Sequence, residues 1–121
     1  MQISGAIPVL RMFSEEKARE FYVDFLGFSV DWEHRFEADL PLYMQIRRGD
    51  LLIHLTGHHG DATPGSTIFV PMQEIEPFCQ ALNAKGYGFS RPGIVEQGWG
   101  KVMEIADPSG NRIRFCELSQ D

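Results

Sequence analysis

Two cysteines are all that this chain of 121 residues contains, and other features that would fix a class of protein are equally scarce. Cys79 falls in an expected helix and Cys116 on an expected strand, which is too few for a secreted disulfide scaffold or a thiolate metal site. We expect both to be reduced thiols in or near the core. No serine stands in a Gly-x-Ser-x-Gly elbow and neither cysteine has a recognisable His and acid partner, so the sequence carries no motif for nucleophilic catalysis.

Basic residues and long apolar runs are also lacking. Lys and Arg number 11 against 17 Asp and Glu, a formal net charge of −6, and no basic stripe is present that would bind nucleic acid. No apolar run approaches the roughly 20 residues of a membrane helix. Because the segment Met1–Gly5 lacks the regions of a signal peptide, we expect a cytoplasmic protein without a membrane partner. An acidic protein can instead favour cationic ligands.

The chain does contain an internal repeat of its secondary-structure elements. A first helix is expected after the N-cap Ser14 and ends at Gly27, and a second runs from about residue 73 to 85 and stops at Gly86. Strands surround each helix, so the sequence predicts two β-α-β-β-β modules at an offset of about sixty residues. The modules span residues 5–56 and 66–118 of a single domain, residues 1–121. We expect an α+β fold in which each helix covers one face of its sheet and the other faces border a shared groove.

The strands of both modules follow from alternation and turn signals. Ala6 to Met12 contains Pro8, which cannot donate to a ladder, so this strand belongs at an edge or is exchanged with a partner. The further expected strands are residues 28–37, 42–48, 51–56 and 67–70, and a loop is expected from 57 to 65.

A last hairpin surrounds the turn Asp107–Asn111, whose Pro, Gly and Asn suit a bend. Pairing Ile105 with Ile113 puts the apolar residues on one face, and a one-residue slip would turn them all over. This register sets Glu104 opposite Arg114. Arg114 then either forms a cross-strand pair with Glu104 or binds an anionic ligand.

The chain resembles the bleomycin resistance proteins, small members of the glyoxalase/dioxygenase (vicinal oxygen chelate) superfamily. The resemblance runs from Ala6–Leu10 through Glu20–Tyr22 and Leu26–Phe28 to the motifs Glu96–Gly100 and Asp107–Asn111. It implies a homodimer, often with exchanged N-terminal strands, whose two interface grooves bind a bulky cationic glycopeptide antibiotic without altering it.

The enzymes of this superfamily hold a divalent metal through four side chains, one near the first and one near the last strand of each module. By motif spacing, the resemblance puts these positions here on Ile7, His54, Thr67 and Arg114. Only His54 is a good ligand, since Ile7 has no donor and Arg114 would repel a cation. We therefore expect no metal, no other cofactor and no catalytic centre.

Three histidines offer a different metal site. If a strand carried both His54 and His58, they would lie about 13 Å apart at 3.3 Å per residue. Metal donors lie about 2 Å from the ion, so the loop with His58 and His59 would have to fold back sharply. The plainer interpretation is that the loop histidines are solvated and that His54 faces the groove and hydrogen-bonds a neighbour or a ligand.

The candidate ligand-binding residues are mainly aromatic, because flat rings stack on heteroaromatic groups and attract cations. They are Trp32, Phe36, His54, Phe69, Glu96 and Trp99. Core or dimer-interface packing is the alternative for the rings, above all for Phe69 on its short strand. Trp99 lies between two glycines, which favours a place in the groove, and the neighbouring Glu96 can meet a cationic group or simply be solvated.

Three functions remain open at this point. The first is sequestration of a bleomycin-like or other bulky, partly cationic antibiotic by a non-catalytic homodimer, which would confer resistance. The second is a metal-dependent enzyme of the same superfamily with shifted ligands, using His54 and one of Glu104 or Glu117. The third is binding of a different small metabolite.

Overall fold

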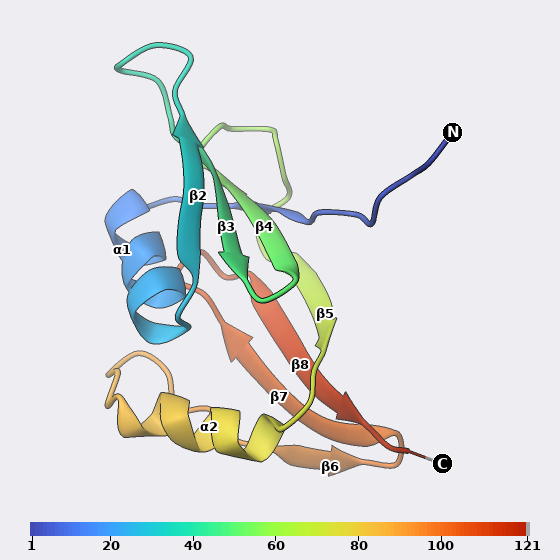
Figure 1. The fold of residues 1–121 in the computed structure, drawn as a ribbon. Helices are drawn as coiled ribbons and strands as arrows, with labels where there is room; N and C mark the ends of the chain where they lie inside the picture. The colour runs from blue at the N-terminus through green and yellow to red at the C-terminus, as the bar shows by residue number, and fades with distance from the viewer. Residues whose placement is uncertain (121) are drawn as a thin grey trace.

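The computed structural model describes residues 1–120, which form eight β-strands, two α-helices and one π-helix (Figure 1). In chain order these are β1 (Val9–Arg11), α1 (Glu15–Arg19), η1 (Glu20–Phe25), β2 (Ser29–His34), β3 (Tyr43–Arg48), β4 (Leu51–Thr56), β5 (Thr67–Pro71), α2 (Ile75–Ala84), β6 (Val95–Gln97), β7 (Gly100–Ala106) and β8 (Arg112–Leu118). The strands of these residues form two four-stranded sheets, ordered β1-β4-β3-β2 and β5-β8-β7-β6. The same order in both sheets confirms the predicted α+β fold of two βαβββ modules.

The first strand is shorter than the sequence indicated. It begins at Val9 and not at Ala6, and it pairs in parallel with β4 at the edge of its sheet. The carbonyl of Pro8 accepts a 2.9 Å hydrogen bond from the backbone N–H of His54, but Pro8 has no N–H to extend the ladder further. Residues 1–6 are exposed and project away from the body of the molecule (Figure 1). The edge position predicted from Pro8 is confirmed.

The first helix begins and ends where its caps were predicted. The hydroxyl of Ser14 accepts a 3.1 Å hydrogen bond from the backbone N–H of Lys17, which satisfies one free donor of the first turn. From Glu20 the helix widens into η1, so the N–H of Leu26 bonds to the carbonyl of Phe21, five residues earlier. Gly27 follows with φ 83, a conformation that favours glycine.

The last hairpin has the predicted register. Ile105 pairs with Ile113, and Glu104 pairs with Arg114. Ile105 and Ile113 are buried, whereas Glu104 is exposed, so the apolar side chains share one face as expected. Since a shift by one residue would expose both isoleucines, burial fixes this register.

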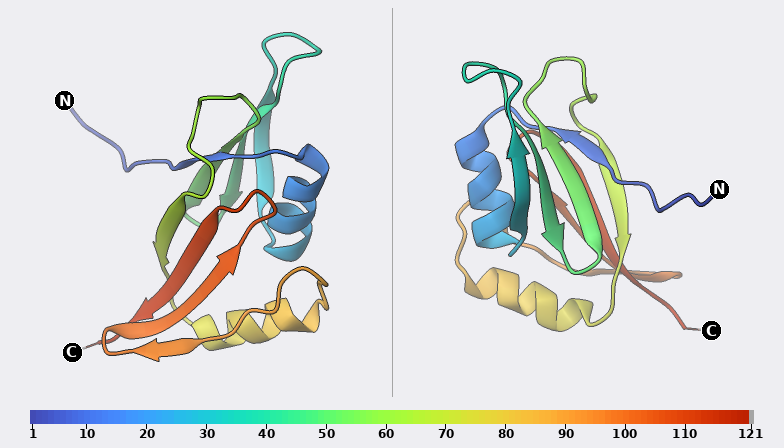
Figure 2. Two further views of the ribbon diagram at one scale, coloured as in Figure 1. Left: turned by 180° about the vertical axis from the view of Figure 1, so that it is seen from behind. Right: turned by 45° about the horizontal axis from the view of Figure 1, so that its top comes forward.

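The two modules share a continuous apolar core, and the turn between β7 and β8 ties them together. The amide of Asn111 donates a 2.7 Å hydrogen bond to the carbonyl of Arg11 in the first module, while its oxygen accepts one from the N–H of Ser66. Figure 2 shows this turn beside the segment that joins β1 to α1. The predicted turn at Asp107–Asn111 is therefore also a contact between modules.

Two smaller expectations concern the cysteines and membrane spans. Cys79 and Cys116 are both free and buried, as predicted for reduced core thiols. In the part of the chain that the structure describes, residues 1–120, no helix is long and apolar enough to cross a membrane.

Candidate ligand-binding site

Each sheet turns one face to a helix and leaves the other face uncovered. On β4, Ile53 and Leu55 are fully buried against the core, whereas the intervening His54 points to the opposite side. Residues that pair in register share a face of the sheet. We call the uncovered face of the first sheet, formed by Val9, Trp32, Tyr43, Gln45 and His54, the first open face. The second open face consists of Phe69, Trp99, Glu104, Arg112 and Arg114 on the other sheet.

Three rings gather on the first open face. The rings of Trp32 and Tyr43 are nearly parallel, with centroids 6.0 Å apart and 9° between their planes. His54 meets Trp32 edge to face at 5.2 Å. Trp32 remains 42% exposed, so its ring is available to a ligand. The structure therefore brings together two of the residues singled out in the sequence, Trp32 and His54, and adds Tyr43.

Hydrogen bonds across β3 and β4 engage both ring nitrogens of His54. The amide nitrogen of Gln45 donates to Oδ2 of Asp31 at 2.8 Å, which orients the amide oxygen toward Nε2 of His54 at 2.9 Å. The amide oxygen can only accept, so Nε2 is the donor of this pair, and Nδ1 is hydrogen-bonded to the hydroxyl of Tyr43 at 2.7 Å. Both ring nitrogens of His54 are thus engaged with neighbours, as one of the sequence interpretations expected.

The hydroxyl of Tyr43 keeps its proton more firmly than an ordinary phenol. Burial raises the pKa of Tyr43, and the negative charge of Asp61 raises it further. A neutral phenol can form the hydrogen bond to Nδ1 of His54, so the raised pKa extends this arrangement to higher pH.

Phe36 lies beyond the end of β2, at the rim of this face. Its ring packs edge to face on His34 at 4.5 Å and on His58 at 5.6 Å, and it is 69% exposed. Phe36 is therefore neither a core residue nor a member of the Trp32 group. It links the strand to the loop that carries His58.

The second open face carries an ion pair and two aromatic rings. Nη2 of Arg114 lies 2.8 Å from Oε1 of Glu104, which confirms the predicted cross-strand pair. Phe69 and Trp99 have ring centroids 6.0 Å apart at an angle of 42°. Both are about half exposed, at 46% and 49%, so neither is a core residue.

A concavity of about 380 Å³ adjoins Trp99 and the ion pair. Its lining residues are Gly93, Val95, Gln97, Trp99, Val102, Glu104 and Arg114. Gly100 fixes the approach of the Trp99 turn to β8, because a Cβ there would lie 2.6 Å from the carbonyl oxygen of Glu117. The glycine after Trp99 is thus required by a close backbone contact.

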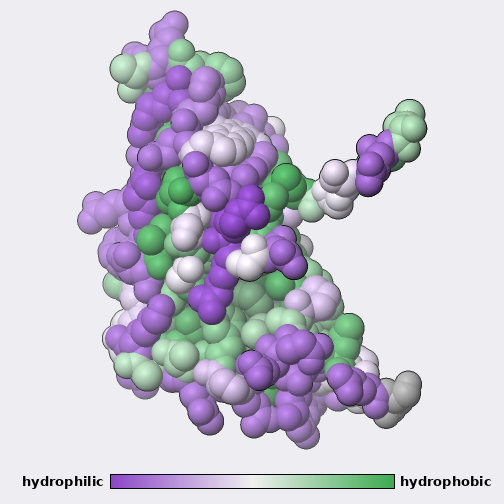
Figure 3. Space-filling view, viewed as in Figure 1, coloured by the Kyte–Doolittle hydropathy of each residue, from purple (hydrophilic) through white to green (hydrophobic). Residues whose placement is uncertain are grey.

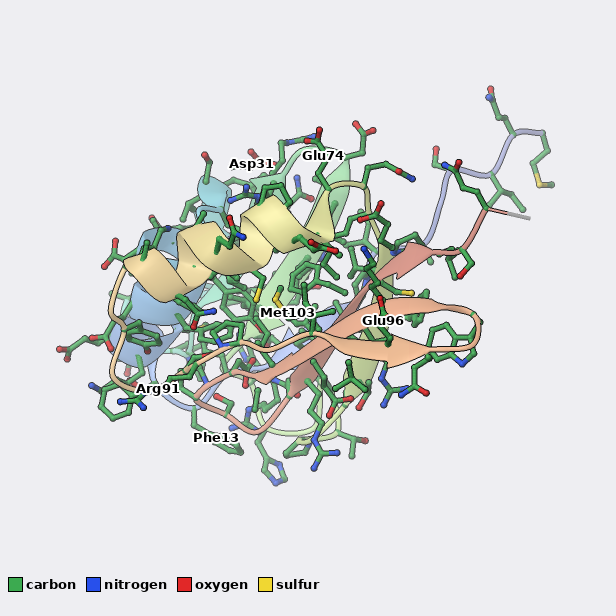
Figure 4. The ribbon with its side chains drawn as sticks, turned by 90° about the horizontal axis from the view of Figure 1, so that it is seen from below. Phe13, Asp31, Glu74, Arg91, Glu96 and Met103 are labelled. Atoms are coloured by element: carbon green, nitrogen blue, oxygen red, sulfur yellow. The ribbon has the colours of Figure 1, made fainter. Side chains whose placement is uncertain are left out.

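Glu96 lies apart from the other candidates. It pairs with Lys101, whose amine forms a salt bridge to Glu76 on α2. The side chains of Val95 and Gln97 take the opposite face of β6 and line the concavity of Trp99. In Figure 4, Glu96 lies on β6, and Met103 lies between β7 and α2 in the core. The sequence did not indicate which face of this short strand Glu96 would take.

The expected metal positions align differently from the spacing used on the sequence. His54 pairs with Val9 and not with Ile7 on the neighbouring strand. Arg114 likewise pairs with Phe69 and not with Thr67. The parallel pairing of the first and last strands of each module sets this alignment. Neither Val9 nor Phe69 has a donor atom for a metal. Within residues 1–120 there is no group of three or more His, Cys, Asp or Glu side chains that could hold an ion.

The modules place equivalent cross-strand contacts on the two open faces. In the first, His54 hydrogen-bonds Gln45, its pairing partner on β3. In the second, Arg114 bonds Glu104, its pairing partner on β7. The side chain on the last strand of each module is therefore held by a neighbour on the adjacent strand.

Two modules of this topology, each with a helix on one face and the other face open, define the α+β fold of bleomycin-resistance-like proteins of the vicinal oxygen chelate type. Residues 1–121 match the family described as glyoxalase superfamily protein, so the chain belongs to the glyoxalase superfamily. No match was found among curated proteins.

Solved structures with the same fold include three proteins with antibiotics in their descriptions. The bleomycin resistance determinant encoded on transposon Tn5 superposes with a TM-score of 0.76 at 21% identity, over 98% of this chain and 100% of that chain. TnmS3, an antibiotic binding protein from Streptomyces sp. CB03234, superposes with a TM-score of 0.75 at 21% identity, over 98% of this chain and 99% of that chain. The bleomycin-binding protein from Streptomyces verticillus, complexed with copper(II)-bleomycin, gives 0.72 at 22% identity, over 99% of both chains. At these identities the likeness establishes the fold.

Proposed function

We propose that the protein binds a bulky, partly cationic antibiotic of the bleomycin type on its open faces, without altering it, and so confers resistance by sequestration. The observation that carries this proposal is the set of exposed rings on uncovered sheet faces, Trp32 on one and Phe69 and Trp99 on the other. Two solved relatives of the same fold are described as bleomycin-binding proteins in complex with the drug, which supports this ligand class.

The non-catalytic part of the proposal is supported by the chemistry of the positions where the superfamily's enzymes hold a metal. His54 has both ring nitrogens in hydrogen bonds, and Arg114 is a cation paired with Glu104. A metal ion at these positions would have to displace the bonds of His54 and approach a guanidinium. In the superfamily's enzymes the metal is the Lewis acid that polarises the substrate or activates water, and these side chains are poorly suited to hold it.

We further propose that the protein acts as a homodimer and that the N-terminal segment contributes to it. Met1 and Ile3 are fully or largely exposed, at 117% and 86%, on a segment that leaves the body beside the edge strand β1. An edge strand presents unpaired backbone groups that a second chain can use. Sedimentation of the full chain and of a variant lacking residues 1–8 tests this, because the shortened chain is expected to be monomeric at concentrations where the full chain is a dimer.

A titration with bleomycin tests the proposed ligand directly. The two tryptophans lie on different open faces, so the variants Trp32→Phe and Trp99→Phe each leave one reporter of fluorescence. We expect saturable quenching at micromolar drug in both variants, and recovery of the drug with unchanged mass. Quenching without saturation, or a drug that gains or loses mass on incubation, would contradict sequestration.

A second candidate is suggested by the charges beside Trp99. Arg112 and Arg114 both approach Glu104, at 4.0 and 2.8 Å, so two cations share one carboxylate on the second open face. This excess of positive charge favours a ligand with an acceptor or anionic group next to its ring. Competition between bleomycin and an aromatic carboxylate, each titrated against Trp99 fluorescence, separates the two candidates.

A further inference from the structure

A cavity outside the open faces lies where the modules meet on the helical side. It has a volume of about 560 Å³ and separates the tip of the β3–β4 hairpin from the first half of α2. In the space-filling view this is the apolar hollow between polar side chains above and below (Figure 3). We call it the junction cleft, and its lining residues are Phe28, Arg48, Asp50, Leu51, Val70, Pro71, Met72, Gln73, Glu74, Pro77, Phe78, Ala81 and Phe115.

The floor of the junction cleft is apolar and aromatic. Phe28 and Phe115 are buried, and the rings of Phe78 and Phe115 meet edge to face at 5.2 Å. A volume of this size falls within the roughly 300–1,000 Å³ of small-molecule sites, which are also lined mainly by apolar side chains. The cleft therefore suits a small ligand with an apolar body.

The single cation of the lining is already engaged. Arg48 donates a hydrogen bond to the carbonyl of Leu26 at the end of the first helix. Its guanidinium also lies over the ring of Phe78, 4.9 Å from the centroid. Arg48 thus stabilises the helix end and one wall of the cleft, and its charge is partly satisfied there.

Two carboxylates of the lining are not engaged in this way. Among residues 1–120, neither Asp50 nor Glu74 forms a salt bridge within 4.0 Å. Glu74 directly precedes α2 with φ 58, and its side chain makes no capping bond, because Glu117 from β8 accepts from the N–H of Ile75 instead. Figure 4 shows Glu74 at the start of α2. Two free negative charges therefore border an aromatic floor.

We propose that the junction cleft is a second binding site, separate from the open faces, for a small amphipathic cation: an ammonium group on an aromatic or branched apolar body. The apolar body would lie on Phe28, Phe78 and Phe115, and the ammonium would face Asp50 and Glu74. Aromatic faces and carboxylates both attract an organic cation, so body and charge favour the same ligand class.

Nuclear magnetic resonance on the 121-residue chain tests this site, with benzyltrimethylammonium as the probe and benzenesulfonate as its anionic counterpart. We expect the cation to shift the backbone amides of Val70, Met72 and Ala81 saturably, with much smaller changes at Trp99. The sulfonate is expected to leave the same amides unshifted.

Two sets of variants make the test specific. Ala81→Trp places a ring in the cleft from the exposed surface of α2 and is expected to abolish the shifts. Gln80→Trp puts the same ring on the adjacent position, outside the cleft lining, and is expected to keep them. Asp50→Asn combined with Glu74→Gln is expected to lower the affinity of the cleft for the cation by about fivefold, the effect of losing a charge contact in water.

Three outcomes of the probe titrations would overturn the proposal. They are equal shifts from the cation and the sulfonate, shifts confined to the open faces, and undiminished shifts in a folded Ala81→Trp variant. Movement of the same amides with protein concentration in the absence of probe would assign the cleft to a second copy of the chain and would also overturn it.

Discussion

The hydroxyl of Tyr22 donates a 2.6 Å hydrogen bond to Oδ2 of Asp107, a residue 85 positions further along the chain. The other carboxylate oxygen accepts from the backbone N–H groups of Ser109 and Asn111 at 2.8 and 2.9 Å. Asp107 therefore organises its own turn and holds that turn to the first helix. This contact joins the two modules inside their common core.

Replacing Tyr22 by Phe tests the strength of this link. We expect the free energy of unfolding to fall by about 1.5–3 kcal/mol, the range for a buried hydrogen bond to a charged group, because Asp107 loses one donor. Urea denaturation of the wild type and the variant measures it. A change below half a kcal/mol would mean that the remaining donors satisfy Asp107 without Tyr22.

The same pair predicts a dependence on alkaline pH. Burial raises the pKa of Tyr22 well above its ordinary value of 10.0, and the negative charge of Asp107 raises it further. Because the folded pKa is the higher one, the stabilisation is complete below pH 10 and is lost as the pH rises above it. We expect urea midpoints to fall more steeply above pH 10 in the wild type than in Tyr22→Phe. Parallel pH profiles would contradict this.

Trp99 is predicted to matter for binding and little for stability. Its ring is 49% exposed, so Trp99→Ala is expected to change the free energy of unfolding by less than about 1 kcal/mol. Loss of an aromatic contact in a binding site typically costs about 2 kcal/mol or more, so we expect bleomycin affinity to fall at least about tenfold. Calorimetric titration and urea denaturation measure the two effects, with Phe89→Ala as a control because Phe89 is exposed elsewhere. Equal losses would make Trp99 a structural residue.

The two glycines around Trp99 are predicted to differ. A Cβ on Gly100 would approach the Glu117 carbonyl oxygen at 2.6 Å and Sγ of Cys116 at 2.9 Å, whereas a Cβ on Gly98 would meet nothing within 4 Å. We expect Gly100→Ala to lower stability by about 1–3 kcal/mol and Gly98→Ala to leave it nearly unchanged. Thermal unfolding of both variants checks this, and similar melting temperatures would contradict the close contact at Gly100.

Metal content tests the proposed lack of catalysis. We expect the purified protein to hold far less than one equivalent of zinc, nickel, iron or manganese, because His54 is bonded at both nitrogens and Arg114 is paired. Mass spectrometry of the digested, dialysed protein measures it. A stoichiometric, tightly held ion would favour a metal-dependent enzyme with shifted ligands.

Local patterns predicted much of the fold. The Ser14 cap and the pairing of Ile105 with Ile113 depend on residues close in sequence, where propensity and burial point to one answer. The plan of two modules followed from the repetition of such local patterns along the chain. The limits of β1 were wrong by three residues at its start, because Pro8 ends the ladder there. The spacing of the apolar residues did not predict that the first helix widens into η1. The same spacing is compatible with an α-helix and with a π-helix.

The candidate site was predicted less completely. The sequence singled out Trp32 and Trp99, whose rings are exposed, but gave no sign of Tyr43, because only the register of β3 against β4 brings it to His54. The face taken by Glu96 depends on where the short strand β6 begins. The junction cleft is formed by segments of different modules, and no pattern within either module could indicate it.

Equivalent positions of the two modules hold chemically different side chains. Val9, His54 and Gln45 in one correspond to Phe69, Arg114 and Glu104 in the other, so an imidazole–amide pair in the first module corresponds to a guanidinium–carboxylate pair in the second. A molecule long enough to touch both kinds of face would meet a polarised imidazole at one end and a guanidinium–carboxylate pair at the other. The two open faces therefore offer different hydrogen-bonding groups, so an asymmetric molecule that touched both would favour one orientation.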